Sequence, residues 1–357
     1  KKTLEWGLVA IAFSIVVLPL VVFNGLFFPF ITSKAFLFRF LVEIGVVVLL
    51  LLALWDKAYI PRITPITVLF ATFVVVMLVA DLFGANIVRS IWSNFERMEG
   101  WIMLAHLFGL FLIFERVLFS GGLWKRWVQA TLSVSVLVGM HGVAQLFGSA
   151  EIHQGGVRLD ANFGNAAYLA VYTLFHVFFA AWMFFASRTW WLKGVYGCIG
   201  VLNLVLLYYS GTRGALLGLL AGIGVSLFAY AVIGKKMKVL GALIGFVLVV
   251  LMGFGFLVAQ KSEPWVAEDP VLNRISTISL AEGETRFRIW NIALQGFYER
   301  PILGWGQGNF NLVFSKYYNP ELYDQEPWFD RAHNVLFDWL IAGGIIGLIS
   351  YLLVFGA

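Results

Sequence analysis

The chain contains a series of apolar stretches, most of them about long enough to cross roughly 30 Å of hydrocarbon at about 1.5 Å per helical residue. A helix is the natural structure for each, because inside lipid every backbone polar group needs a partner. The stretches are residues 7–22, 36–55, 66–83, 101–118, 128–147, 165–186, 195–209, 214–233, 239–258 and 334–355. The sequence therefore predicts an all-α, polytopic integral membrane protein with about ten or more transmembrane helices.

Composition supports this class and excludes others. With 61% hydrophobic and 13% charged residues, the chain carries more apolar surface than a soluble core could hide. The single cysteine, Cys198, rules out a disulfide framework and a cysteine-based metal site. The net charge of +5 comes without a basic patch interleaved with aromatic residues, so we expect membrane lipids and no nucleic acid as partners.

The apolar stretches and the polar segments between them predict three regions. Residues 1–258 form a bundle of about nine spans, 259–333 an outer polar segment with an amphipathic helix, and 334–357 the last visible span. Lys1 and Lys2 precede a first stretch without a clear small-residue cleavage site, so we expect a retained helix. The last stretch has no polar stop, so we expect the protein to continue beyond it.

Positive charge predicts the orientation. With the N-terminus inside, the inside connections are residues 56–65, 115–127, 187–194 and 234–238. They contain Lys57, Arg62, Arg116, Lys125, Arg126, Arg188, Lys193, Lys235, Lys236 and Lys238, as the positive-inside rule expects. Trp124, Trp127, Trp190 and Trp191 flank these connections as interface anchors. The outer side has isolated arginines that orientation does not explain: Arg89, Arg97, Arg158, Arg213, Arg286, Arg288 and Arg331.

Two of these arginines stand near the start of a span. Arg213 follows a short glycine-containing turn, and Arg158 precedes the stretch 162–165 with its two asparagines. A guanidinium at a helix N-terminus suits phosphate recognition, because both offer hydrogen-bond donors. The alternatives are an arginine that reaches lipid headgroups and, for Asn165, a helix cap, which we favour.

The outer segment predicts an amphipathic helix over residues 284–300, with Trp290, Leu294 and Phe297 at helical spacing. Arg286 shares a face with Trp290, whereas Arg288 points elsewhere. One arginine would face a site while the other pairs with Glu282 or Glu284; a solvated, salt-bridged face is the alternative. Pro301, Gly304, Gly306 and Gly308 then predict a turn-rich loop.

His333 and Asn334 lie where the last span begins. An imidazole ordinarily titrates near pH 6.5 and can take a proton from an alcohol. The alternatives are that His333 caps the helix or binds a headgroup, and that Asn334 is a cap or a ligand for His333. Asp324, Glu326 and Asp330 are nearby, but their spacing is too generic to predict a cation site. Glu43, His106, His141 and His176 lie in apolar stretches, where we expect helix–helix hydrogen bonds.

Several of these motifs occur together, in order, over roughly residues 158–357. They are Arg213-Gly214 opening a span, Arg286 with Trp290 before the proline and glycine loop, and His333-Asn334 followed by Gly343, Gly344 and Gly347. This combination resembles the O-antigen ligase and polymerase superfamily of bacterial polytopic membrane proteins.

The resemblance implies a metal-independent, inverting glycosyltransferase of the bacterial inner membrane that needs no cofactor and whose active site faces the periplasm. It implies catalytic roles for His333, Arg213 and Arg286, and substrate-binding roles for Arg158, Asn165, Arg288 and Asn334. The donor would be a glycan on undecaprenyl diphosphate. The acceptor would be lipid A–core in a ligase, another glycan in a polymerase, or a protein in an O-oligosaccharyltransferase. Family members usually have further spans after this last one.

A lipid or solute transporter, such as a flippase, is the rival class. It would share the hydropathy and the arginines, but it should show paired broken helices or a line of ionisable groups across the membrane. The sequence shows neither convincingly, although Glu43 and the histidines of the apolar stretches keep this alternative open.

Overall fold

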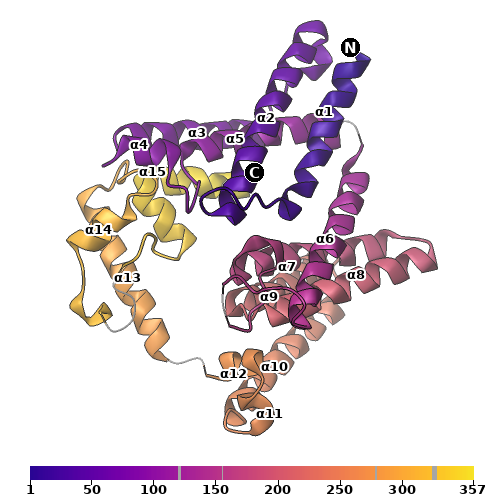
Figure 1. Ribbon diagram of the computed structural model, residues 1–357, viewed down its shortest axis with the longest axis vertical. Helices are drawn as coiled ribbons and strands as arrows, with labels where there is room; N and C mark the ends of the chain where they lie inside the picture. The colour runs from indigo at the N-terminus through magenta and orange to yellow at the C-terminus, as the bar shows by residue number, and fades with distance from the viewer. Residues whose placement is uncertain (120–121, 155, 278–279, 324–327) are drawn as a thin grey trace. The chain divides into compact units, whose positions relative to one another are not determined.

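The computed structural model describes residues 1–119, 122–154, 156–277, 280–323 and 328–357 (Figure 1). These residues form helices and connections, without a strand among them. Within this part of the chain, ten helical segments are long and apolar enough to cross a membrane: Lys2–Leu20, Pro29–Trp55, Pro65–Leu82, Trp101–Phe119, Trp124–Leu146, Ala166–Ala186, Trp190–Tyr209, Arg213–Ile233, Lys238–Ala259 and Val335–Gly356. The all-α, polytopic prediction is therefore confirmed.

Several helices begin earlier than the apolar stretches predict. Helices α2 (Pro29–Trp55), α6 (Trp124–Leu146) and α8 (Trp190–Tyr209) start four to seven residues before them. Trp124, Trp127, Trp190 and Trp191 therefore lie inside helices, so that the two connections before these helices are shorter than predicted, and the role of the tryptophans as interface anchors stays a prediction. Hydropathy marks the hydrocarbon core, whereas a helix can continue through the headgroup layer, where Trp, Lys and Arg are favoured.

The chain divides into two compact units. Unit 1 comprises Lys1–Trp127 and Ser279–Ala357, and unit 2 comprises Val128–Ile278, so that the boundary lies within α6. We describe each unit by itself. The three regions predicted above refer to the two sides of a bilayer, a different criterion from packing, so that division stays a prediction.

In unit 1, the last helix is held by two groups of elements. Helix α15 (Val335–Gly356) packs against α3 (Pro65–Leu82), where Phe73, Met77 and Ala342 share a buried cluster. Helices α13 (Leu280–Glu299) and α14 (Phe310–Lys316) lie beside α15 (Figure 1) and share a second cluster with it. The other α-helices that lie wholly in this unit are α1 (Lys2–Ser14), α2, α4 (Ile87–Trp92) and α5 (Trp101–Phe114).

The buried stripe of α13 differs from the predicted one. Ile289, Ile292 and Ala293 are fully buried, whereas Trp290 and Phe297 pack as partly buried neighbours of the cluster. The helix carries apolar residues over a wider arc than a single row, and the branched and small side chains take its centre. The prediction of a helix was right, but the position of its buried face was shifted.

The proline and glycine loop after α13 packs against a break in α15. Gly344 has a φ of 61°, which interrupts the helix. The carbonyl groups of Ile341 and Ala342 accept hydrogen bonds from Trp305 N–H at 2.7 Å and Gly306 N–H at 3.0 Å. A broken helix in a membrane is tolerated where its freed backbone groups find partners. The loop therefore fastens the end of α13 to the helix that follows His333.

Unit 2 contains most of α6, then α7 (Ala166–Ala186), α8, α9 (Arg213–Ile233) and α10 (Met237–Ala259). Two short helices follow, α11 (Pro264–Ala267) and α12 (Pro270–Ser276). Gly139 of α6 lies against α8, since a Cβ atom there would be 2.6 Å from Leu202 Cδ2.

The ionisable residues of the spans form hydrogen bonds between elements. The Nε2 atom of His176 is 2.9 Å from Thr131 Oγ1, which joins α7 to α6. In unit 1 the Nε2 atom of His106 is 3.1 Å from Glu43, and in unit 2 His141 Nδ1 is 3.0 Å from Asn162 Oδ1. The expected structural role of these residues is therefore confirmed.

Candidate functional site

Arg158 lies on the short turn that precedes Arg213. Its guanidinium donates to the Ser210 carbonyl at 2.9 Å and to the Thr212 hydroxyl at 3.0 Å. Gly211, at the centre of the turn, has a φ of 59°, a conformation that glycine adopts without strain. Two arginines that are far apart in the sequence are thus brought to one end of unit 2.

A buried network fixes the segment that carries Arg158. Asp160 is fully buried and accepts hydrogen bonds from the Gln145 side chain at 2.7 Å and from Gln154 N–H at 2.8 Å. The side-chain oxygen Oε1 of Gln145 in turn accepts from Ala161 N–H at 2.8 Å. Asn165 caps α7, because its side chain accepts from Ala167 N–H at 2.8 Å. The cap interpretation of Asn165 is therefore confirmed, and its binding role stays a prediction.

Arg158 and Arg213 line a cavity of about 440 Å³ together with Arg274. Arg274 lies on α12, which begins with a strong start signal: Pro270 stands in the first turn, and Asp269 accepts the N–H groups of Val271 and Leu272. The sequence analysis missed Arg274. The Asp-Pro pair was a visible sign of the helix, but the packing of α12 that brings Arg274 to the cavity was not.

The cavity is strongly cationic. The described residues that line it include three arginines and no carboxylate. Burial lowers the pKa of Arg158, and the positive charge of Arg274 lowers it further. Like charges held together in a partly desolvated cavity repel one another, and a bound anion relieves that repulsion. The geometry therefore suits a ligand with more than one negative charge.

In unit 1, the residues around His333 are held from both sides. Asn334 caps α15 by accepting Leu336 N–H at 3.0 Å, so the cap is Asn334 and not His333. Ala332 donates its N–H to Asp338 at 2.9 Å and accepts from the Trp290 indole at 3.1 Å. His333 itself is exposed, with a φ of 52°. Its imidazole packs edge-on against Phe329, with ring centroids 5.7 Å apart, on a backbone that is fixed at both neighbours.

The two arginines of α13 have different environments. Arg288 forms ion pairs with Glu321 at 3.1 Å and with Glu284 at 3.8 Å. Arg286 is exposed, and none of the described residues forms an ion pair or a hydrogen bond with its side chain. Of the two arginines, Arg288 is therefore the one that pairs with Glu284, as expected for one of them. The side chain of Glu282, the other expected partner, lies outside the described residues.

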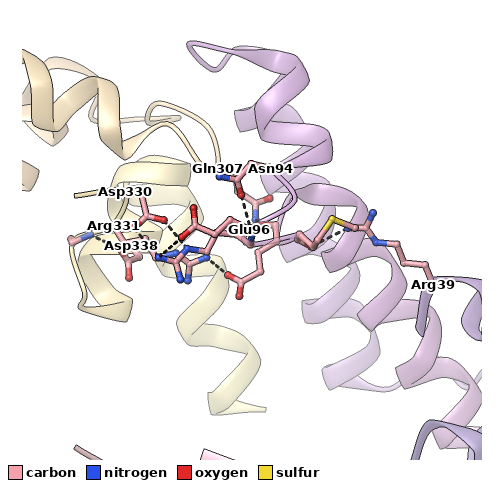
Figure 2. A network of polar contacts seen from close by, with 11 residues as sticks. Arg39, Asn94, Glu96, Gln307, Asp330, Arg331 and Asp338 are labelled. Atoms are coloured by element: carbon pink, nitrogen blue, oxygen red, sulfur yellow. Dashed lines mark hydrogen bonds and ion pairs between the residues drawn. The ribbon is translucent and has the colours of Figure 1, made fainter. Parts of the chain in front are cut away.

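A polar network joins the connection before α5 to the segment before α15 (Figure 2). Arg97 binds Asp330 through two hydrogen bonds of 2.7 and 3.1 Å, and Arg331 pairs with Glu99. At the other end, the buried Arg39 donates to the Met98 carbonyl at 2.9 Å. Arg97 and Arg331 are thus bound in ion pairs within the protein. The carboxylate of Asp330 is the partner of Arg97. Asp324 and Glu326 lie outside the described residues.

The candidate residues therefore fall into two groups. Unit 2 brings together Arg158 and Arg213, and adds Arg274. Unit 1 places Asn334 beside His333, while Trp290, one helical turn after Arg286, contacts the residue before His333. Arg288 is turned to its ion pairs.

A comparison with protein families finds a match to part of the chain. A family model described as O-antigen ligase matches residues 198–352, which contain Arg213, Arg274, Arg286, Arg288, His333 and Asn334. Arg158 and Asn165 precede the matched region. Searches of curated proteins and of solved structures find no match. Residues 198–352, somewhat less than half of the chain, therefore match the O-antigen ligase family, a family of membrane glycosyltransferases of the ligase and polymerase type, and the described part of the chain has ten candidate membrane spans.

Proposed function

We propose that the chain transfers a glycan from undecaprenyl diphosphate to an acceptor hydroxyl, either of lipid A–core or of another glycan, on the periplasmic face. The family assignment supports a lipid-linked glycan as substrate. The main structural support for the proposal is the cavity that is lined by Arg158, Arg213 and Arg274 and has no carboxylate among its described lining residues. A diphosphate is the part of such a donor that this cavity suits.

In this reaction the arginines stabilise the leaving group. The bond between the anomeric carbon and the phosphate oxygen breaks, and negative charge grows on the departing diphosphate. Each guanidinium that follows this charge contributes about 2–4 kcal/mol, by analogy with oxyanion-stabilising donors. Arginine suits the task because its planar fork binds two phosphate oxygens at once.

His333 takes the proton of the acceptor hydroxyl. The hydroxyl oxygen attacks the anomeric carbon from the side opposite the diphosphate, so the configuration at that carbon inverts. We assign Arg286 to charge stabilisation, because it is exposed and has no ion-pair partner among the described residues. We also propose that substrate is bound by Arg288, Asn165 and Asn334. Each of these has a structural role as well: Arg288 forms ion pairs, and the two asparagines cap helices.

Transfer in a reconstituted system tests the proposal. Proteoliposomes with the purified protein receive a radiolabelled undecaprenyl-diphosphate glycan and an acceptor, without nucleotide or ion gradient. We expect transfer by the wild type and strongly reduced transfer by Arg213→Lys, because a point charge lacks the fork of donors. Arg188→Lys, at an exposed position of an inside connection, is the matched control and should be active. Movement of the donor that needs a gradient, without transfer, would indicate a transporter.

A further inference from the structure

Unit 1 has a cavity of its own, of about 250 Å³, where α5 and α15 begin. Three arginines and three acidic residues line it: Arg89, Arg97, Arg331, Glu99, Asp330 and Asp338. The ion pairs described above join Arg97 to Asp330 and Arg331 to Glu99. Of the six charged residues that line the cavity, only Arg89 and Asp338 take no part in these two ion pairs.

Arg89 is the unexplained cation of this cavity. It is half-buried on α4, and its side chain lies against Gly308, where a Cβ atom would be 3.5 Å from Arg89 Cγ. Within the described part of the chain, its guanidinium has no ion pair and no hydrogen bond. A partly buried cation without a partner costs stability, which an anion bound in the cavity would offset.

Asp338 and the apolar residues of the lining indicate which chemical groups a ligand of this cavity would carry besides its negative charge. One carboxylate oxygen of Asp338 accepts the Ala332 N–H at 2.9 Å, and a carboxylate can accept further hydrogen bonds, such as those of hydroxyl groups. Met103 and Leu107, from the first two turns of the span Trp101–Phe119, supply an apolar wall. The cavity thus combines a cation, an acceptor of hydroxyl hydrogen bonds and an apolar surface.

We propose that this cavity binds a sugar residue that carries a carboxylate or a phosphate. Arg89 binds the anionic group, Asp338 accepts hydrogen bonds from hydroxyl groups, and Met103 and Leu107 contact the apolar face or the aglycone. The volume of about 250 Å³ holds a small group such as one sugar residue and not a long chain. In the reaction proposed above this would be a subsite for the acceptor; that role rests on the proposed function, whereas the binding does not.

Binding to the full chain in nanodiscs tests the proposal with a matched pair of probes. Phenyl β-glucuronide and phenyl β-glucoside differ in one carboxylate, and inorganic phosphate provides an anion without a sugar. We expect wild-type protein to bind the glucuronide at least about tenfold more tightly than the glucoside, as for a hydrogen bond to a charged group. Arg89→Gln should remove that preference. Arg62→Gln, at an exposed position of an inside connection, should keep it.

A second variant tests the apolar wall. Leu107→Ser should weaken both phenyl glycosides by a similar factor and leave the preference for the carboxylate intact. Equal affinity for the two glycosides, an unchanged preference in Arg89→Gln, or phosphate bound as tightly as the glucuronide would each overturn the proposal, as would no binding of the glucuronide at millimolar concentration. Because no donor is present, these outcomes do not depend on whether glycan transfer occurs.

Discussion

At the scale of single residues, charge balance distinguishes two groups among the arginines that we expect on the outer side. Arg97, Arg288 and Arg331 have carboxylate partners and hold segments together. Arg158, Arg213 and Arg274 share a cavity without a carboxylate among its described lining residues. Sequence position alone could not make this distinction, because Asp330 is far from Arg97 in the chain.

The account of His333 predicts a defect in chemistry and not in donor binding. His333→Gln keeps a hydrogen-bonding side chain but loses proton transfer, so turnover should fall by about 10²–10⁴ as for a general base. An imidazole is inactive as a base when protonated, so wild-type activity should fall towards acidic pH and the variant should lose that acidic limb. Turnover and donor affinity, measured separately against pH, check this.

The helix cap provides the control for this variant. Because the cap of α15 is Asn334, Asn334→Ala should lower the free energy of unfolding by about 1 kcal/mol, whereas His333→Gln should leave it nearly unchanged. Near-normal turnover of His333→Gln with weakened donor binding would limit His333 to holding the donor.

At the scale of elements, the contact between the glycine loop and the break in α15 makes a prediction about stability. Gly304 has a φ of 68°, and a Cβ atom there would overlap the Ile341 carbonyl. Gly304→Ala should therefore lower the free energy of unfolding by at least about 1–2 kcal/mol, the cost of the backbone conformation alone. Thermal unfolding in detergent measures this.

Helix α10 offers a matched control for that substitution. Gly241 has no atom near its missing Cβ and an ordinary helical backbone, so Gly241→Ala should be neutral or slightly stabilising. Equal unfolding temperatures for the two variants would mean that the loop does not fasten α15.

Helix α13 makes a prediction about its two arginines. Arg286→Ala should abolish transfer with folding intact, because Arg286 has no structural partner among the described residues. Arg288→Ala should reduce transfer less, and its effect should be reproduced by Glu321→Gln, which removes the other half of the 3.1 Å ion pair. Transfer assays on the three variants check this; an essential Arg288 beside a dispensable Arg286 would reverse the roles.

How far the sequence predicts these elements depends on the range of the interactions. Apolar length predicted the spans, and the proline with its glycines predicted the loop after α13, because both signals are local. The buried face of α13 was predicted only in part: Trp290 and Phe297 pack against the buried cluster, but the position of Ile289 at its centre depends on what packs against the helix. Arg274 was missed for the same reason: α12 has a local start signal, but its contribution to the cavity is a tertiary contact.

At the scale of the whole molecule, the orientation in the membrane is a prediction from the positive charges of the inside connections. In a Cys198→Ser background, a cysteine at Gly283 should react with an impermeant thiol reagent from the outside. A cysteine at Lys236 should react only after permeabilisation. The reverse pattern would place the outer arginines in the cytoplasm and remove the periplasmic reaction from the proposal.

The central claim is that Arg158, Arg213 and Arg274 form a diphosphate site. The most direct test is the affinity of the protein in nanodiscs for farnesyl diphosphate and for farnesyl monophosphate, in the wild type and in Arg274→Gln, with Arg188→Gln as the control. We predict that the wild type and the control bind the diphosphate at least about tenfold more tightly than the monophosphate, as for added charge-assisted hydrogen bonds, and that Arg274→Gln loses most of this preference. Equal affinity for the two lipids in the wild type, or an unchanged preference in Arg274→Gln, would contradict the claim.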